Sequence, residues 1–354
     1  METAAGLARR ALGRVWPSAA VGCVLVKGGE VVGRGWTQAG GRPHAEAEAL
    51  RRAGAKARGA VCYVTLEPCA HEGKRGPSCA GLLEKAGIKR LIVALADPDP
   101  RTRGKSIASL RDRGIEVREG LLENEARALN VGYFKRTLLG YPLVTMKIAA
   151  SSDGKIAPKD GWKAWVTGEP ARMFGHRLRA AHDAVLTGIG TVLADDPELT
   201  CRLPGCEEAT PVRVILDTHL RISPNAKVLA SAKHHPVWIV SQRQDLPPAL
   251  ARKGAKLLAV PSTRDIAEVL KTLAKNGITR LLVEAGSRLN ASMLASGFVD
   301  EIAWFGSKLE FGPDALPAVF GKPGITGPAL VRGFEVFETR GFGADALHML
   351  RPSE

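Results

Sequence analysis

The spacing of apolar residues predicts alternating strands and helices in the first part of the chain. An apolar run at residues 21–26 is followed by the turn Lys27-Gly28-Gly29-Glu30 and a second run at residues 31–36, which is the pattern of a β-hairpin. We expect further strands at residues 61–66, 90–95 and 116–118, and helices at residues 45–58, 80–86, 106–113 and 123–139. Strands separated by helices of this length predict a parallel or mixed sheet with helices on its faces.

The same alternation begins again after Gly140-Tyr141-Pro142, so we expect two domains, at residues 1–140 and 141–354. A chain of 354 residues is too long for one ordinary core and suits two domains. In the second domain we expect strands at residues 143–149, 184–187, 212–216, 237–240, 257–260 and 281–283, and helices at residues 170–181, 263–276 and 288–296. Both halves therefore belong to the α/β class.

The composition is that of a globular protein, with 24% charged and 45% hydrophobic residues. No apolar run approaches the roughly 18–20 residues that span a bilayer. The first 14 residues contain Arg9, Arg10 and Arg14 and no long apolar run, so we interpret them as a short amphipathic helix and not as a signal peptide. We therefore expect a cytoplasmic protein without a membrane partner.

The net charge of +14 suits an anionic ligand, from a phosphorylated metabolite to a nucleic acid. The Lys and Arg residues are scattered along the chain, so a solvated basic surface without functional meaning explains the charge equally well. The six cysteines indicate a metal site or buried thiols, because a disulfide framework is unusual in a cytoplasmic protein of this size.

Four residues have the types and the order that a catalytic zinc site requires: His44, Glu46, Cys69 and Cys79. Zinc prefers imidazole and thiolate ligands in a tetrahedral site, and one His with two Cys leaves the fourth position for water. Glu46 can move protons without binding the metal, as in the zinc-deaminase pattern H-x-E followed by P-C-x-x-C. Here nine residues, not two, separate the cysteines. The residues alone thus favour zinc catalysis and leave open one buried thiol and one loop thiol.

Two stretches of the first half resemble the riboflavin-biosynthesis deaminase/reductase family. They are Gly33-Arg34-Gly35-Trp36-Thr37 through Gly41-Arg42-Pro43-His44-Ala45-Glu46, and Val64-Thr65-Leu66-Glu67-Pro68-Cys69-Ala70-His71. That family separates its cysteines by a longer loop bearing His, Gly and Pro, and residues 70–78 look like a slightly lengthened version of it. Asp97-Pro98-Asp99-Pro100, followed by Gly104-Lys105, is similar to a substrate-side loop of the family. The resemblance extends over nearly the whole chain.

The resemblance implies a cytidine-deaminase-like three-layer α/β/α sandwich, with zinc bound by His44, Cys69 and Cys79 and protons carried by Glu46. The implied reaction is hydrolytic deamination of 2,5-diamino-6-(5-phosphoribosylamino)pyrimidin-4(3H)-one. The implied substrate contacts are Ser18, His71, Lys74 and Asp97. Ser18 is a departure, because the family usually has Pro-Asn-Pro before Val-Gly-Cys where this chain has Pro17-Ser18-Ala19-Ala20. A hydroxyl replaces the donor and acceptor of an amide, so we expect base recognition to be rearranged.

The second half offers weaker signals of its own. Gly188-Ile189-Gly190-Thr191 is only a fragment of a dinucleotide-binding motif. Glu284-Ala285-Gly286-Ser287 follows an expected strand and precedes an expected helix, and free N–H groups at a helix start favour phosphate. An ordinary strand–loop–helix turn explains the same residues.

Three segments of this half are similar to the reductase domain of the same family: residues 146–154, 191–197 and 283–286. The resemblance implies a dihydrofolate-reductase-like α/β domain that uses NADPH to reduce the ribosyl group to ribityl. The implied NADPH contacts are Ala150, Trp165, Thr191, Asp195 and Gly286. The implied substrate contacts are Lys147, Arg179, Leu199, Arg202 and Glu284. Arginine suits the substrate phosphate because its planar donors bind in pairs.

Three other functions remain as alternatives. A deaminase of tRNA or single-stranded DNA with an accessory domain would use the positive charge, but aromatic residues for base stacking make up only 5%. A reductase with an inactive deaminase domain conflicts with the intact zinc motif. A structural zinc module needs a fourth protein ligand, for which His71 is the candidate. We therefore expect a bifunctional enzyme that is a homo-oligomer, acts on a phosphorylated pyrimidine and has no nucleic-acid partner.

Overall fold

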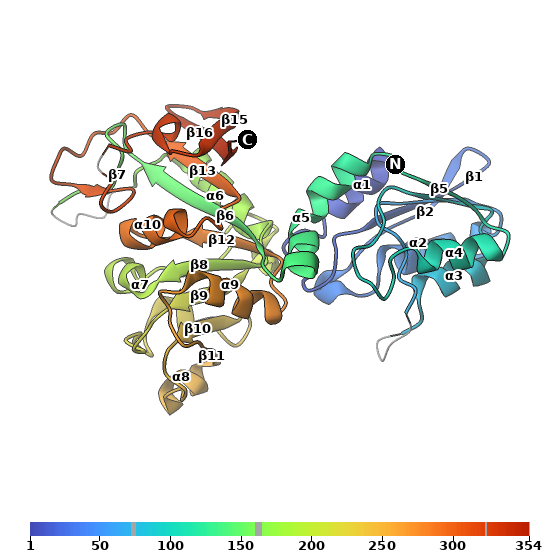
Figure 1. Ribbon diagram of the computed structural model, residues 1–354, viewed down its shortest axis with the longest axis horizontal. Coiled ribbons are helices and arrows are strands. Elements are labelled where there is room, and N and C mark those ends of the chain that lie inside the picture. The colour runs from blue at the N-terminus through green and yellow to red at the C-terminus, as the bar shows by residue number, and fades with distance from the viewer. Residues whose placement is uncertain (72–75, 160–164, 323, 354) are drawn as a thin grey trace. The chain divides into compact units, whose positions relative to one another are not determined.

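The computed structural model describes residues 1–71, 76–159, 165–322 and 324–353. It divides into two compact units, Met1–Gly140 and Tyr141–Glu354, and each is built around a sheet of its own (Figure 1).

The first unit contains a five-stranded mixed sheet in the order β2-β1-β3-β4-β5. Its strands are β1 (Gly22–Lys27), β2 (Glu30–Trp36), β3 (Val61–Val64), β4 (Arg90–Val93) and β5 (Glu116–Glu119). β1 pairs antiparallel with β2 and β3, whereas β3, β4 and β5 are parallel. Gly28 and Gly29 have φ values of 59° and 83°, as a two-residue hairpin turn requires, so the hairpin predicted from the sequence is confirmed.

Helices cover both faces of this sheet. They are α1 (Glu2–Arg9), α2 (Ala45–Ala53), α3 (Cys79–Ala86), α4 (Lys105–Asp112) and α5 (Glu123–Leu139), with short 3-10 turns at Ala39–Gly41 and Gly54–Ala57. Val24 of β1 packs with α1, which has α5 beside it, while Cys23 and Leu25 point into the core beneath α2 and α3. Alternate residues of one strand thus face different helices, as the pleat of a strand dictates. The result is the three-layer α/β/α sandwich.

Glycines on β2 let α2 approach the sheet closely. A Cβ on Gly35 would lie 2.1 Å from the carbonyl oxygen of Ala45, and a Cβ on Gly33 would lie 2.3 Å from that of Ala49. No side chain fits at either position without moving the helix. This close packing sets where α2 begins, and therefore where His44 lies.

The second unit contains a nine-stranded sheet in the order β11-β10-β9-β8-β12-β6-β13-β16-β15. Its strands are β6 (Leu143–Ala150), β8 (Ala184–Gly188), β9 (Val212–Leu216), β10 (Val237–Ser241), β11 (Ala255–Ala259), β12 (Arg280–Glu284), β13 (Glu301–Gly306), β15 (Phe334–Phe342) and β16 (Asp345–Pro352). The strands from β11 to β13 are parallel, and β16 and β15 complete the sheet in antiparallel pairing. A separate two-stranded sheet joins β7 (Lys155–Ala157) to β14 (Leu316–Pro317).

The helices of the second unit lie between its strands along the chain. They are α6 (Glu169–Ala180), α7 (Ile189–Asp195), α8 (Pro248–Lys253), α9 (Ile266–Lys275) and α10 (Ser287–Ala295), with 3-10 turns at Glu207–Ala209, Lys227–Leu229 and Pro328–Leu330. Ile189 and Val192 of α7 pack with Val185 and Ile215 of the central strands. Phe174 of α6 packs with apolar residues of β13 and β16. This arrangement belongs to the dihydrofolate-reductase-like α/β class predicted from the sequence.

Several predicted elements differ from the structure in extent or were missed. The helix expected at residues 45–58 ends at Ala53, because the chain turns at Gly54 with a positive φ of 54°. The sequence analysis did not predict β13, β15 or β16. Most residues of β15 are exposed, and the half-buried ones all lie on one face. Charged residues therefore interrupt the alternation of apolar and polar positions by which a strand is predicted from sequence. The short helices α7 and α8 were also missed.

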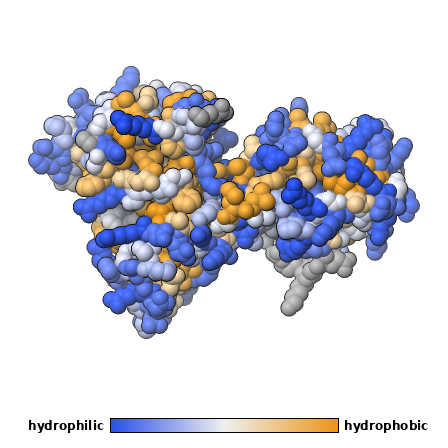
Figure 2. All heavy atoms as spheres, viewed as in Figure 1, coloured by the Kyte–Doolittle hydropathy of each residue, from blue (hydrophilic) through white to orange (hydrophobic). Residues whose placement is uncertain are grey.

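The surface visible in Figure 2 is mainly hydrophilic, as the composition of a globular protein predicts. Hydrophilic side chains cover much of the visible face of each unit, with apolar residues gathered in smaller patches (Figure 2). No helix among the described residues has the length and the apolar character that crossing a membrane requires. The helix predicted for the first 14 residues is present as α1, but it ends at Arg9.

Candidate functional site

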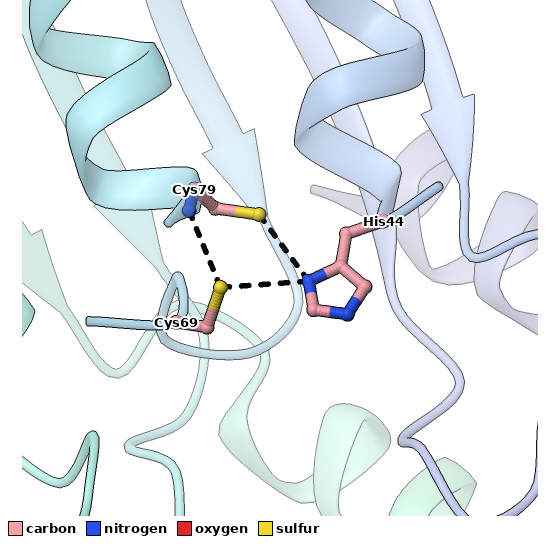
Figure 3. A group of neighbouring side chains, drawn as sticks. All are labelled: His44, Cys69 and Cys79. Carbon is pink, nitrogen blue, oxygen red and sulfur yellow. Dashed lines mark hydrogen bonds between the residues drawn. The ribbon is translucent and has the colours of Figure 1, made fainter. Parts of the chain in front are cut away.

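Three side chains from distant parts of the sequence converge in the first unit (Figure 3). His44 is the N-cap of α2, Cys79 is the first residue of α3, and Cys69 lies in the loop that follows β3. Ser78 caps α3 by accepting a hydrogen bond from the Gly81 N–H, which fixes the start of that helix. Two helix starts and one loop thus hold the three residues.

The three ligand atoms lie close together. The His44 Nδ1 is 3.6 Å from the Cys69 Sγ and 3.3 Å from the Cys79 Sγ, and the Cys79 backbone N–H donates to the Cys69 Sγ at 3.2 Å (Figure 3). All three ligand atoms fall within 4.8 Å of one another. Both thiols are buried and His44 is half-buried, so the cluster is shielded from most of the solvent.

The cluster favours a thiolate. Hydrogen bonds from Cys79 and His44 lower the pKa of Cys69 to about 4, although burial opposes this. The Cys69 thiolate and burial raise the pKa of Cys79 well above its usual range. Burial alone would lower the pKa of His44, but the bond to Cys69 and the charge of Glu46 raise it. The Cys69 thiolate therefore provides a negative charge that attracts a metal cation to this cluster.

The donor set fits zinc. One imidazole nitrogen and two sulfurs are the soft and borderline ligands that zinc prefers, and three protein ligands are the number that catalytic zinc sites have. Among the described residues, the group of candidate ligands consists of His44, Cys69 and Cys79. His71, the candidate fourth ligand of a structural module, is not in that group.

Glu46 lies in the first turn of α2, two residues after His44. Its side chain is buried, with 3% of the residue exposed. Burial raises the pKa of Glu46 to about 6, despite the opposing charge of His44. A carboxylate with a pKa near neutrality can both accept and release protons, which is the behaviour of a general acid–base group.

The other candidate residues of the first unit differ in their surroundings. The Asp97 side chain is buried and its Oδ1 accepts hydrogen bonds from the Asp99 N–H at 2.9 Å and the Tyr133 hydroxyl at 3.1 Å. Burial raises the pKa of Asp97 to about 6. His71 is half-buried, with its Nδ1 3.4 Å from the Thr102 Oγ1.

Ser18 and Lys74 complete the candidates of this unit. Ser18 is half-buried beside Gly41, on which a Cβ would lie 2.4 Å from the Ser18 Oγ. Lys74 lies outside the described residues.

In the second unit, three charged side chains meet beside the carboxyl end of β12. Arg179 of α6 binds Glu284 through two hydrogen bonds, from Nε to Oε1 at 2.6 Å and from Nη2 to Oε2 at 3.0 Å. Lys147 is the register partner of Glu284 across β6 and β12, and its Nζ lies 3.8 Å from the Glu284 Oε2. Burial alone would raise the pKa of Glu284, but Arg179 and Lys147 lower it to about 2. Two cations thus face one carboxylate, which leaves positive charge for an anionic ligand.

Three of the five candidate cofactor residues lie at the carboxyl ends of neighbouring parallel strands. Ala150 is the last residue of β6 and is buried, Gly286 is the N-cap of α10 just after β12, and Thr191 belongs to α7 just after β8. A Cβ on Gly286 would lie 3.4 Å from the Thr191 Oγ1, so these two residues are neighbours. Ligands of open parallel sheets bind at this edge.

The remaining candidates are more exposed, except for Leu199. Trp165 is 70% exposed and stacks under the Arg172 guanidinium, 4.7 Å from the ring centroid. Asp195 ends α7 and is exposed. Leu199 is buried with a φ of 56°, an unusual conformation for leucine.

Two side chains of α6, Arg179 and His176, hold the backbone around Leu199. The Arg179 Nη1 donates to the carbonyl of Thr200 at 2.9 Å, and the backbone N–H of Arg202 donates to the His176 Nδ1 at 3.3 Å. Arg202 is exposed and its Nη1 lies 3.1 Å from the Glu198 Oε2.

Some residues at these sites were missed by the sequence analysis. Thr102 and Tyr133 touch the candidate residues His71 and Asp97, and His176 touches the backbone of Arg202. Tyr133 lies 36 positions from Asp97, and no spacing rule connects them. For His176 a signal existed, because it precedes Arg179 by three positions and so lies on the same side of a helix.

Two protein-family models match the chain. The RibD C-terminal domain matches residues 142–339. The cytidine and deoxycytidylate deaminase zinc-binding region matches residues 1–95, which include all three residues of the metal cluster.

Curated relatives and solved structures agree with these matches. The chain is 42% identical to the riboflavin biosynthesis protein RibD of Bacillus amyloliquefaciens, over 92% of this chain and 88% of the relative. It is 36% identical to RibD of Escherichia coli, over 99% of this chain and 98% of the relative. A structure of Acinetobacter baumannii RibD superposes with a TM-score of 0.88 at 36% identity, covering 100% of this chain and 98% of that one. A diaminohydroxyphosphoribosylaminopyrimidine deaminase/5-amino-6-(5-phosphoribosylamino)uracil reductase from Thermotoga maritima superposes with a TM-score of 0.86 at 33% identity, covering 100% and 97%.

Proposed function

Because the chain belongs to the RibD family of riboflavin-biosynthesis enzymes, we propose that residues 1–140 carry its deaminase site and residues 141–354 its reductase site. The enzyme is a bifunctional deaminase and reductase whose cofactors are zinc and NADPH. The convergence of His44, Cys69 and Cys79 in the first unit supports the assignment most strongly, because it unites a metal donor set with the buried acid Glu46.

We assign the zinc ligands to His44, Cys69 and Cys79 and the proton transfers to Glu46. Zinc bound there would act as a Lewis acid that makes water a nucleophile near neutral pH. The Glu46 carboxylate accepts the proton that the attacking water releases and returns a proton to the nitrogen of the leaving amine. Its pKa of about 6 suits both roles, since the group is mostly ionised at pH 7 but is easily protonated.

The proposed substrate of this site is 2,5-diamino-6-(5-phosphoribosylamino)pyrimidin-4(3H)-one. The name of the Thermotoga maritima protein supports this choice. We assign substrate contacts to Ser18, His71, Lys74 and Asp97. Asp97 can accept hydrogen bonds from hydroxyl or amino groups, and His71 can donate one. Lys74 offers a cation for the phosphate.

In the second unit we assign the deaminated substrate to Lys147, Arg179, Leu199, Arg202 and Glu284. NADPH, when bound, would supply a hydride, and solvent water the accompanying proton, so that the ribosyl group gains two hydrogens and becomes ribityl. Lys147 and Arg179 orient the substrate through its oxygens, and Glu284 holds both cations in place. We assign the NADPH contacts to Ala150, Trp165, Thr191, Asp195 and Gly286.

We also propose that the enzyme acts in the cytoplasm, as a homo-oligomer and without a nucleic-acid partner. All six cysteines are free thiols, which suits a reducing compartment. The edge strand β15 exposes Val336 and Phe337, which association between copies would cover. The alternative function, a nucleic-acid deaminase, does not explain why the chain contains a reductase unit.

Exchange of Glu46 for Gln separates the two activities. We expect Glu46→Gln to retain zinc and to lose deamination by about 10²-fold or more, because general acid–base groups commonly contribute that much. Reduction of the already deaminated substrate by NADPH should continue at the wild-type rate. The assays are ammonia release and loss of NADPH absorbance. Normal deamination by Glu46→Gln would refute the role of Glu46, and loss of both activities would refute the division between the units.

A further inference from the structure

Glu67 lies in the turn between β3 and the metal cluster, directly before Pro68 and Cys69. Only 2% of its surface is exposed. Its backbone N–H donates to the carbonyl of Leu95 at 2.8 Å, which joins this turn to the chain that leaves β4. The catalytic role proposed above does not involve this buried acid.

The Glu67 carboxylate holds both ends of residues 97–104, which we call the 97–104 segment. Its Oε2 accepts hydrogen bonds from the backbone N–H of Asp97 at 3.2 Å and of Gly104 at 3.0 Å. Its Oε1 accepts a hydrogen bond from the Ser106 hydroxyl at 2.8 Å. Hydrogen bonds to a charged acceptor are stronger than those between neutral groups, so this one side chain closes the segment into a defined loop.

The carboxylate is also placed favourably for α4. Gly104 is the N-cap of this helix and makes no side-chain cap, so the helix start depends on an acceptor from elsewhere. A negative charge near the N-terminus of a helix is stabilised by the helix dipole. Glu67 therefore fixes the 97–104 segment and the helix that follows it at the same point.

The 97–104 segment contacts the other side of the metal-binding turn as well. The buried Thr102 accepts a hydrogen bond at its Oγ1 from the Ala70 N–H at 3.4 Å, and lies 3.4 Å from the His71 Nδ1. Hydrogen bonds accepted by the Glu67 carboxylate and donated by the Ala70 N–H thus flank Pro68 and Cys69. The segment cannot shift without disturbing residues on both sides of a metal ligand.

We propose that Glu67 is a positioning residue for the deaminase: it fixes Asp97, at the start of the segment, relative to Cys69 and His71. This inference rests on the proposed deaminase site of the first unit. Asp97 and His71 recognise the pyrimidine or its sugar, whereas Cys69 belongs to the metal centre where the amine leaves. Glu67 thereby fixes the distance from the substrate contacts Asp97 and His71 to the metal ligand Cys69, and it does not touch the substrate itself.

The role predicts an effect on substrate binding that a purely structural role does not. A carboxylate that only stabilised the fold would change the free energy of unfolding and the amount of active enzyme. A positioning carboxylate changes the Michaelis constant of deamination while zinc and kcat are retained, since misplaced substrate contacts weaken binding. Glutamine should substitute well, because its carbonyl can accept both backbone bonds and its NH₂ group can donate to Ser106.

The test compares the variants Glu67→Ala and Glu67→Gln in the full-length, zinc-loaded enzyme, with the diaminopyrimidinone as substrate. Glu48→Ala is the matched control, since Glu48 is another buried acid of the first unit but pairs with Arg51. For Glu67→Ala we expect a KM for ammonia release raised roughly tenfold or more, because the variant loses all three hydrogen bonds that hold the 97–104 segment and Ser106. Zinc content, kcat and the reductase rate should stay near the wild type. Glu67→Gln and Glu48→Ala should keep the wild-type KM.

Hydrogen exchange gives a second readout that does not depend on activity. Loss of the carboxylate should speed exchange of the Asp97 and Gly104 amides, which both donate to it. If Glu67→Ala does not fold, Ser106→Ala removes one of the same bonds and should raise both the exchange rate and the KM. An unchanged KM in the folded variant, or a loss of zinc and kcat at constant KM, would overturn the proposal. A wild-type enzyme that releases no ammonia would instead refute the deaminase function itself.

Discussion

Arg179 and Glu284 form a two-point ion pair at the carboxyl end of β12, with both side chains only 13% and 12% exposed. The pair joins helix α6 to the strand and lies where the reductase substrate is proposed to bind. Because both side chains are largely buried, removal of one charge should destabilise the second unit.

Glu284→Gln should lower the free energy of unfolding of the second unit by about 3 kcal/mol, because it leaves Arg179 buried without a counter-charge. Asp314→Asn is the control: its partner Lys159 is 74% exposed, and such surface pairs contribute about 0–1 kcal/mol. Urea unfolding at pH 7 measures both. The pKa of Glu284 is lowered to about 2, so its stabilisation is present above the usual value of 4.5 and is lost as the pH falls toward 2. Equal losses in the two variants would show that the pair contributes little.

The metal centre should hold about one zinc ion per chain, as a site of one His and two Cys does in zinc enzymes. Cys79→Ser should remove most of the zinc, because it deletes a thiolate ligand. Cys206→Ser should retain it, since Cys206 belongs to the second unit. Elemental analysis of freshly purified protein measures the content. Active protein without zinc would contradict this prediction.

The pH dependence of substrate binding should report on Asp97. Its pKa is raised to about 6 by burial, so it is ionised at pH 7 and becomes protonated as the pH falls below 6. We expect the KM for deamination to rise below pH 6, because the protonated group accepts hydrogen bonds less well. Asp97→Asn should give a raised KM that no longer changes between pH 5 and 8. Asp99→Asn should keep the pH dependence but move its midpoint to lower pH, since the charge of Asp99 contributes to the raised pKa of Asp97. A profile unaffected by Asp97→Asn would refute the assignment.

The two activities should be separable between Gly140 and Tyr141. A fragment of residues 1–140 should release ammonia, and a fragment of residues 141–354 should oxidise NADPH, because each unit has its own sheet and core. Leu138 and Leu139 are 58% and 64% exposed at the end of α5, so Leu139→Lys in the first fragment guards against aggregation. A folded, zinc-bound first fragment without deamination would show that its site needs the second unit.

The sequence predicted the parts of the molecule that depend on local pattern. α5 was expected at residues 123–139, where it lies, and this stretch is rich in the helix-forming residues Glu, Ala, Leu and Arg. The cluster of His44, Cys69 and Cys79 was expected because ligand types and neighbouring motifs narrow the choice of partners.

The parts that depend on distant pairing could not be predicted. β15 and β16 form the antiparallel edge of the second sheet, and the exposed, charged positions of β15 conceal its strand pattern. The contacts of Glu67 were also hidden, because its carboxylate binds backbone N–H groups 30 and 37 positions away, and any residue provides such groups. Sequence reasoning identifies chemically distinctive side chains, whereas their supporting bonds to backbone appear only in the fold.

The most direct test of the account is the identity of the products. The full-length enzyme is incubated with the diaminopyrimidinone, with and without NADPH, and the products are identified by mass spectrometry. We predict that without NADPH an amino group is replaced by oxygen and the ribosyl group is unchanged, and that with NADPH the product also gains two hydrogens as a ribityl chain. Substrate that is reduced by NADPH but never loses its amino group would contradict the account, because the metal-binding unit would then not be a deaminase.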